Sequence, residues 1–228
     1  MARRDRRARV GFGLVVLLAM TVLARVAAAA SAPAPRSGEW DFEVSLDGKP
    51  IGEHRFRLEP DGDGSRLTSQ ARFDVKVLGL TVFRYRHQAV EQWRDGCLVS
   101  LVSSTDDDGK PGHVHFIAAG DGDIGRGVRV ASAPSTPVGC VMSFAYWNPA
   151  MRMQTRLLNA QTGKFEDVHI ACVADAPIMV HGEPVAARAC RVAGASRPVD
   201  VWYAVADGAW IGLDAVVDGG RKLSYRLR

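Results

Sequence analysis

Two histidines, His54 and His87, are the residues of this 228-residue chain whose type and position best suit chemistry. Around each of them apolar and polar residues alternate, which is the pattern of a β-strand that is covered on one face. His54 shares a face with Phe56 and Leu58, and His87 shares a face with Tyr85. We therefore expect both imidazoles to point inward, where a polar group needs a hydrogen-bond partner.

Two interpretations of these inward histidines stay open. In the first, they are core residues whose ring nitrogens are satisfied by neighbours. In the second, they line a cavity for a small molecule, because ligand sites combine an apolar wall with a few polar groups. The small inward residues Ser69, Ala71 and Ala89 favour a cavity, since they leave space unfilled. The candidate ligand-binding residues are then His54, Tyr85, His87, Glu91, Phe144, Tyr146 and Trp147.

Other kinds of chemistry have less support. His113 and His115 share a strand face, but no third ligand lies nearby, so we expect no metal site. The aspartate-rich stretches lack the spaced ligand series of a calcium loop. No nucleophile elbow, phosphate loop or dinucleotide fingerprint occurs in the chain. We expect no cofactor and no catalytic residue, and a non-catalytic role is preferred although an enzyme is not excluded.

A β-sheet is the element that must position these side chains. Asp-Gly steps such as Asp47-Gly48 and Asp95-Gly96 recur along the chain and indicate tight hairpins, because both residue types tolerate positive φ. The alternating segments between such steps predict strands over 39–47, 51–59, 65–78, 81–94, 97–105, 112–119, 127–131, 164–174, 176–182, 185–193, 198–206, 209–218 and 221–228.

The predicted fold is mostly β: a single curled antiparallel meander sheet that forms a barrel or a half-barrel. Alternation stops between Thr136 and Lys164, and there we expect one short covering helix near 137–147. Thr136 is a good N-cap and proline suits the first helical turn. The helix should end by Asn148, because Pro149 disfavours helical geometry in the residue before it. Whether this helix plugs the sheet or gates a ligand stays open.

The first thirty residues have the layout of a secretory signal peptide. Five arginines precede an apolar run over residues 11–23, and Ala28-Ala29-Ala30 fits a cleavage site. The run is shorter than the roughly 20 residues of a membrane-spanning helix, so we expect no stable span after cleavage near Ala30. The expected organisation is a signal peptide over 1–30, a flexible lead-in over 31–37 and a single β-rich domain over 38–228, in a periplasmic protein.

The positive charge of the chain resides in this N-terminal segment. The whole chain has a net charge of +4, and six arginines with one aspartate give the first thirty residues +5. The remaining part is therefore close to −1, and we expect no nucleic-acid partner.

All four cysteines lie in the predicted domain, and an even number in an exported protein favours disulfides over free buried thiols. Three pairings are available. Cys172 and Cys190 flank an expected hairpin and could face each other across it, which would leave Cys97 to pair with Cys140. Spacing alone does not prove this, because a disulfide also has geometric requirements.

Several segments together resemble a known family: Trp40 to Val44 with Ile51-Gly52, Glu91 to Gly96 continuing into Ser104-Thr105, Phe144 to Asn148, Gln161 to Gly163, and Val201 to Tyr203. They resemble a bacterial family of exported proteins of unknown function, with the Tyr146-Trp147-Asn148 segment as the most specific part. The layout is also similar to a second uncharacterised family of envelope proteins. The resemblance covers the chain from about Gly38 onward and implies an exported, β-rich domain without an assigned activity.

The architecture is in addition similar to carriers that ferry lipid or lipoprotein acyl chains across the periplasm, although fold does not determine function. We expect a non-catalytic binding or carrier protein whose partner is an apolar small molecule or a lipid. The first alternative is a structural or interaction protein of the envelope, with a filled core and an envelope protein as its partner. The second is an enzyme that uses inward-facing His54, His87 and Glu91.

Overall fold

Antiparallel strands make up most of the described protein. The computed structural model describes residues 35–118, 139–194 and 197–228, and Ser31–Arg228 forms a compact unit of its own. The strands are β1 (Gly38–Leu46), β2 (Lys49–Asp61), β3 (Gly64–Val77), β4 (Leu80–Arg94), β5 (Cys97–Asp107), β6 (Lys110–Ile117), β7 (Arg156–Leu158), β8 (Phe165–Asp167), β9 (His169–Val180), β10 (Glu183–Ala193), β11 (Val199–Ala204), β12 (Trp210–Val217) and β13 (Arg221–Leu227). Two short 3-10 helices, η1 (Pro149–Met153) and η2 (Asp218–Gly220), accompany them. Within the described ranges no helix is long and apolar enough to cross a bilayer.

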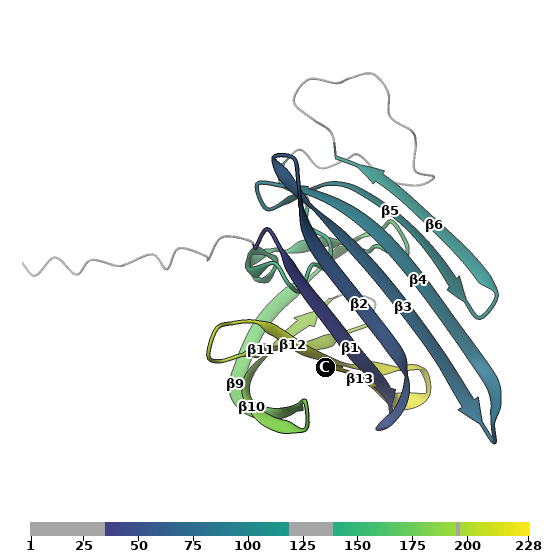
Figure 1. Ribbon diagram of the computed structural model, residues 1–228. Helices are drawn as coiled ribbons and strands as arrows, with labels where there is room; N and C mark the ends of the chain where they lie inside the picture. The colour runs from purple at the N-terminus through teal and green to yellow at the C-terminus, as the bar shows by residue number, and fades with distance from the viewer. Residues whose placement is uncertain (1–34, 119–138, 195–196) are drawn as a thin grey trace, which may run out of the picture. The chain divides into compact units, whose positions relative to one another are not determined.

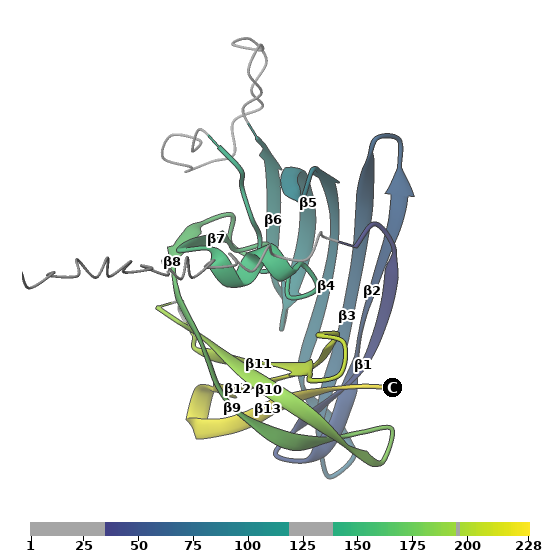
Figure 2. The same ribbon diagram turned by 90° about the vertical axis from the view of Figure 1, so that its left-hand side faces the viewer.

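Eleven strands form one sheet in the order β6-β5-β4-β3-β2-β1-β13-β12-β11-β10-β9, so the first and last strands of the domain meet in its middle. Phe42 of β1 pairs with Leu227 of β13, and Leu46 pairs with Leu223. Figures 1 and 2 show the meander β1–β6 and the meander β9–β13 as two arms that bend toward each other. The sheet is not closed, because β6 and β9 are its edges. The half-barrel form of the predicted fold is therefore confirmed.

The alternation in sequence becomes alternation in burial. Phe42 and Val44 of β1 are fully buried, whereas Asp41 and Glu43 lie on the opposite, wetter face. The expected strands match the observed ones closely, with two differences. The segments 164–174 and 176–182 are divided as β8 and one long strand β9, and the short strand β7 was not expected. The expected strand over 127–131 lies outside the described residues.

The covering helix predicted near 137–147 is wrong. Residues 139–148 are irregular, and helical geometry begins only at Pro149, the first residue of η1. Asn148, expected to end a helix, is instead an N-cap whose side chain accepts from the Ala150 N–H. The backbone of the irregular stretch bonds to other elements: Leu98 N–H donates to Val141 O and Leu158 N–H donates to Met142 O, each at 2.8 Å. These bonds use carbonyls that a helix would need for itself. Thr136 and Pro137 lie outside the described residues.

Both disulfides have the expected partners. Cys172 and Cys190 face each other across β9 and β10 and are bonded. Cys97, the first residue of β5, is bonded to Cys140 at the start of the irregular stretch. The second bond fastens the segment that follows Cys140 to the end of the sheet that carries the β4–β5 turn.

Candidate functional site

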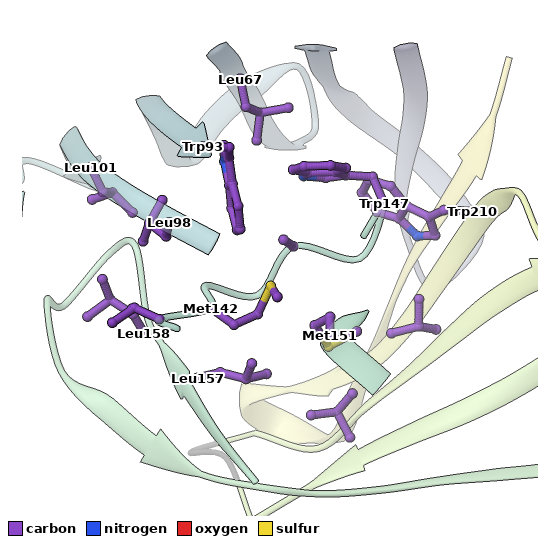
Figure 3. Packing of buried hydrophobic residues seen from close by; sticks show 14 of the residues in the cluster. Leu67, Trp93, Leu98, Leu101, Met142, Trp147, Met151, Leu157, Leu158 and Trp210 are labelled. Carbon is purple, nitrogen blue, oxygen red and sulfur yellow. The ribbon is translucent and has the colours of Figure 1, made fainter. Parts of the chain in front are cut away.

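One half of the inner face of the sheet is covered by the chain from Cys140 to Val168. Its buried side chains include Met142, Met151, Leu157 and Leu158, which belong to the main hydrophobic cluster. Figure 3 shows Met142 between Trp93 of β4 and Leu157 of β7, with Leu98 and Leu101 on the sheet side. This segment has the covering role that was expected of a helix. Because these four side chains are 0–2% exposed, the segment is part of the core.

The two histidines lie on the inner face beyond this covered half. The pairing of β2 through β5 places His54, Ala71, His87 and Thr105 side by side in one row across four strands. We call this the histidine row. The next row across the same strands consists of Phe56, Ser69, Ala89 and Ser103, and we call it the small-residue row.

Each histidine has one hydroxyl partner within these rows. His54 Nε2 lies 2.7 Å from Ser69 Oγ, and His87 Nδ1 lies 2.9 Å from Thr105 Oγ1. The other ring nitrogen of His54 differs: Nδ1 is buried and has no hydrogen-bond partner among the described residues. A buried polar atom without a partner is unfavourable and calls for an explanation.

Aromatic rings surround the rows. The His54 imidazole stacks on Phe56 with ring centroids 4.0 Å apart, and Tyr225 of β13 lies 5.7 Å from it. Phe73 and Tyr85 stack on each other at 5.2 Å in the row on the other side of the histidines. The tyrosine and phenylalanine rings combine apolar faces with, in the tyrosines, a hydroxyl group at the edge.

Burial differs between the floor and the rings around it. The small floor residues are buried, with Ala71 at 2%, Ala89 at 4% and Ser69 at 5% exposure. By contrast Phe56, Tyr85, Tyr146 and Tyr225 keep intermediate exposure. The rows therefore form a floor of small, buried side chains beside larger rings that solvent reaches in part. The covering segment contacts this floor, because Ser103 Oγ donates a hydrogen bond to the carbonyl oxygen of Ala160.

The histidine row carries no charge at neutral pH. Burial lowers the pKa of His54 to about 3, with a further contribution from the neighbouring His87. Burial lowers the pKa of His87 to about 4. Burial also raises the pKa values of the Tyr85, Tyr146 and Tyr225 hydroxyls, and the Tyr225 phenol is close enough to the other two to be affected by them. Neutral imidazoles and phenols both donate and accept hydrogen bonds.

The candidate residues divide into two groups. His54, Tyr85 and His87 lie together, whereas Tyr146 of the covering segment packs on Trp210 of β12, with ring centroids 5.4 Å apart. Phe144 is a half-buried neighbour of Tyr146, with ring centroids 6.3 Å apart.

Glu91 and Trp147 lie instead in the covered half. Glu91 accepts a 2.9 Å hydrogen bond from Trp93 Nε1, and Trp147 packs edge-to-face on Trp93. Burial raises the pKa of Glu91 to about 7, against the opposing effect of hydrogen bonds from Trp93 and Ser143. At 5% and 6% exposure these two side chains are packed and not accessible.

Tyr225 and Thr105 belong to the site but were not among the candidates. Leu223, Tyr225 and Leu227 alternate with polar residues in the last segment, and this alternation is a sequence signal that Tyr225 faces inward. What the alternation could not indicate is that β13 pairs with β1, which brings Tyr225 beside His54. Thr105 could have been found from the register of the β4–β5 hairpin, in which it is the partner of His87.

A surface pocket of about 640 Å³ lies elsewhere, at the start of β1, where its lining includes Glu39, Arg57 and Arg66. Arg57 is paired with Glu39 at 2.6 Å, and both side chains are well exposed. Exposed ion pairs of this kind are common on protein surfaces. This pocket includes none of the candidate residues. Metal binding has no support in the described part of the chain, where no three His, Cys, Asp or Glu side chains are grouped to hold an ion.

The described domain thus belongs to the class of open antiparallel β-meander proteins, with an uncharged band of polar and aromatic side chains on the inner face. The chain is a member of the family of domain of unknown function DUF6134, whose model matches residues 42–228. A family without an assigned activity agrees with the resemblance seen in the sequence. Searches of curated proteins and of solved structures gave no match.

Proposed function

We propose that the protein is a non-catalytic carrier that binds an uncharged, apolar or amphipathic small molecule, such as a lipid-like compound, over the histidine row. The observation that carries the proposal is the buried, unpartnered His54 Nδ1 between Phe56 and Tyr225. Protein atoms cover this nitrogen, so we expect a neighbouring ring to move aside when a ligand's hydroxyl or carbonyl group bonds to it, with the proton on either ring nitrogen as required. The surrounding rings would contact its apolar part.

The electrostatics favour an uncharged ligand. Both imidazoles stay neutral at pH 7, and the neighbouring tyrosines are neutral as well. An anionic or cationic group placed there would be desolvated without an opposite charge, which is unfavourable. The low pKa values also make the histidines weak bases at neutral pH, so they are poorly matched to general base catalysis.

The test uses the small-residue row, because a larger side chain there gives opposite results in a hollow and in a filled interior. Ala89→Leu places a branched side chain beside the histidines. If the space is open, stability changes by less than about 1 kcal/mol and binding of the uncharged probe N-phenyl-1-naphthylamine falls roughly tenfold. If the interior is packed, overfilling destabilises the protein by about 1–3 kcal/mol.

Val90→Leu is the matched control, since Val90 is the next residue of β4, points to the opposite face and is 41% exposed. It should change neither stability nor probe binding. Native mass spectrometry and solvent extraction of the purified protein should in addition reveal a bound apolar molecule. A destabilised Ala89→Leu variant, together with wild-type protein that binds no probe, would overturn the carrier proposal.

We also propose that the protein is exported and acts in the periplasm. Two disulfides support this, because such bonds persist in oxidising compartments. The layout of residues 1–30 supports it independently. N-terminal sequencing of the protein from a periplasmic fraction should begin near Ser31. Recovery of uncleaved chain in the cytoplasm, with reduced cysteines, would refute export.

A further inference from the structure

The hairpin formed by β3 and β4 extends beyond both of its neighbours. Strand β2 pairs with β3 only as far as Gly52 opposite Phe73, and β5 pairs with β4 only as far as Tyr85 opposite Asp107. Residues 74–84 are therefore a two-stranded ribbon without a strand on either side. Figure 1 shows it as the far end of β3 and β4, past the β5–β6 turn. We call residues 74–84 the β3–β4 tip.

The turn of this tip has an apolar residue at a position where the comparable turns of the chain have a polar one. Among the described residues, five non-glycine residues have positive φ, and each precedes a glycine of positive φ. Four of them are polar: Asp47, Asp95, Asp108 and His181. The fifth is Leu78, with φ 50°, which has no polar side chain to bond to the turn. A bulky apolar residue in this conformation is unfavourable, and such local strain is often found at functional positions.

The apolar side chains of the tip are also exposed to water, which is unfavourable. Leu78 is 98% exposed, Leu80 is 72% exposed, and Val77 and Val82 are 55% and 54% exposed. Scattered exposed apolar residues are ordinary, but here four of them lie within six consecutive positions at the end of a projecting ribbon. Basic side chains flank them, with Lys76 on β3 and Arg84 on β4 both exposed. The one acid of the ribbon, Asp74, lies near Arg84 at 3.7 Å and Arg86 at 2.9 Å.

We propose that the β3–β4 tip docks on the surface of a lipid bilayer, with Val77, Leu78, Leu80 and Val82 inserted at the interface and Lys76 and Arg84 against anionic headgroups. Insertion is shallow, because the outward backbone groups of a two-stranded ribbon need water and cannot enter the hydrocarbon. This surface is separate from the histidine row and does not depend on a ligand there.

Size favours a membrane over a protein partner. A buried aliphatic side chain removes roughly 60–120 Å² of apolar surface from water, so the four together offer no more than about 500 Å². A standard protein interface buries about 800 Å² on each partner. A bilayer has no such minimum, since even a few apolar side chains and basic residues give reversible binding.

The decisive variant is Leu78→Asp, which introduces the Asp-Gly turn that this chain has at Asp47, Asp95 and Asp108. It should fold at least as stably as the wild type, because aspartate suits this turn position better than leucine. The assay is flotation of the Ser31–Arg228 unit with vesicles of phosphatidylcholine containing phosphatidylglycerol. The wild type should bind and Leu78→Asp should bind roughly tenfold less. Met153→Asp is the matched control, since Met153 is 74% exposed at the end of η1 and should have no role.

A second measurement reports the position of the tip directly. All four cysteines are in disulfides, so Leu78→Cys provides a single thiol for an environment-sensitive fluorophore. Its emission should shift to the blue with these vesicles, whereas the same label at Met153→Cys should not respond. Absence of wild-type binding, or equal loss in Leu78→Asp and Met153→Asp, would overturn the proposal. So would a wild-type dimer that Leu78→Asp converts to a monomer, since the tip would then bind a second copy of the chain.

Discussion

Tyr225 is three residues from the end of the chain, yet its ring lies 5.7 Å from the imidazole of His54 on the second strand. The contact exists because β13 and β2 flank β1 on its two sides, with Val44 opposite Tyr225 and Phe42 opposite His54. The environment of the histidine row thus depends on both ends of the domain. Its buried groups should make the stability of the whole domain depend on pH.

His87→Gln should flatten the fall in stability on acidification. The folded pKa of His87 is about 4, below its unfolded value of 6.5, so the unfolded state binds a proton that the native state does not. The stability from the neutral ring is complete above pH 6.5 and is lost as pH falls toward 4. Between pH 7 and pH 5 this amounts to about 2 kcal/mol. Glutamine does not titrate and keeps a polar side chain of similar size at this position. Urea unfolding at both pH values checks this, and identical losses in wild type and variant would refute it.

Glu91→Gln should have the opposite effect. The folded pKa of Glu91 is about 7, above its unfolded value of 4.5, so here the native state binds the extra proton. The stability from the protonated carboxyl is complete below pH 4.5 and is lost as pH rises through 7. In the wild type this partly offsets the histidines between pH 5 and pH 7. Without it, the variant should lose about 2 kcal/mol more than the wild type on going from pH 7 to pH 5. An unchanged difference between the two pH values would contradict the assignment of the raised pKa.

Gly52→Ala should be strongly destabilising. Gly52 has φ +155° beside the bulge between β1 and β2, and an added Cβ would lie 1.9 Å from the carbonyl oxygen of Arg72. The strand must move, and we expect a loss of about 2–4 kcal/mol. Gly48→Ala is the control: its φ is +77° and nothing lies near its added Cβ, so only about 1 kcal/mol should be lost. Equal thermal unfolding temperatures for the two variants would show that the close approach to Arg72 is absent.

Removal of the Cys97–Cys140 bond should loosen the covering segment. The bond closes a separation of 43 residues, for which loop entropy predicts about 4 kcal/mol of stabilisation. The Cys172–Cys190 bond spans 18 residues and should contribute about 3 kcal/mol. In the double variant Cys97→Ala and Cys140→Ala, backbone amides such as Leu158 N–H should exchange faster with solvent than in the variant that lacks the Cys172–Cys190 bond. Equal exchange at Leu158 in both variants would argue against the anchoring role.

In the covering segment, local sequence signals predicted a helix that the tertiary structure does not form. Thr136-Pro137 and Asn148-Pro149 suggested the two ends of a helix, since caps and prolines have well-known preferences. The carbonyl of Val141 accepts instead from Leu98 of β5, and the carbonyl of Met142 accepts from Leu158 of β7. Both partners lie outside the stretch in which a helix was expected. Such tertiary bonds override a short and weak helical preference.

Alternation and turn residues were sufficient to place most strands and the inward direction of His54, Tyr85 and His87. They also favoured one disulfide pairing without proving it, and the structure confirms that pairing. These features depend on neighbours within one strand or one hairpin. Alternation of apolar and polar residues along the sequence therefore indicates them directly. The tertiary structure alone decided the pairing of β1 with β13, the separation of Glu91 from the histidine row, and the isolation of Leu78 at a projecting tip. These depend on strand register and on where neighbouring strands end, which no local pattern encodes.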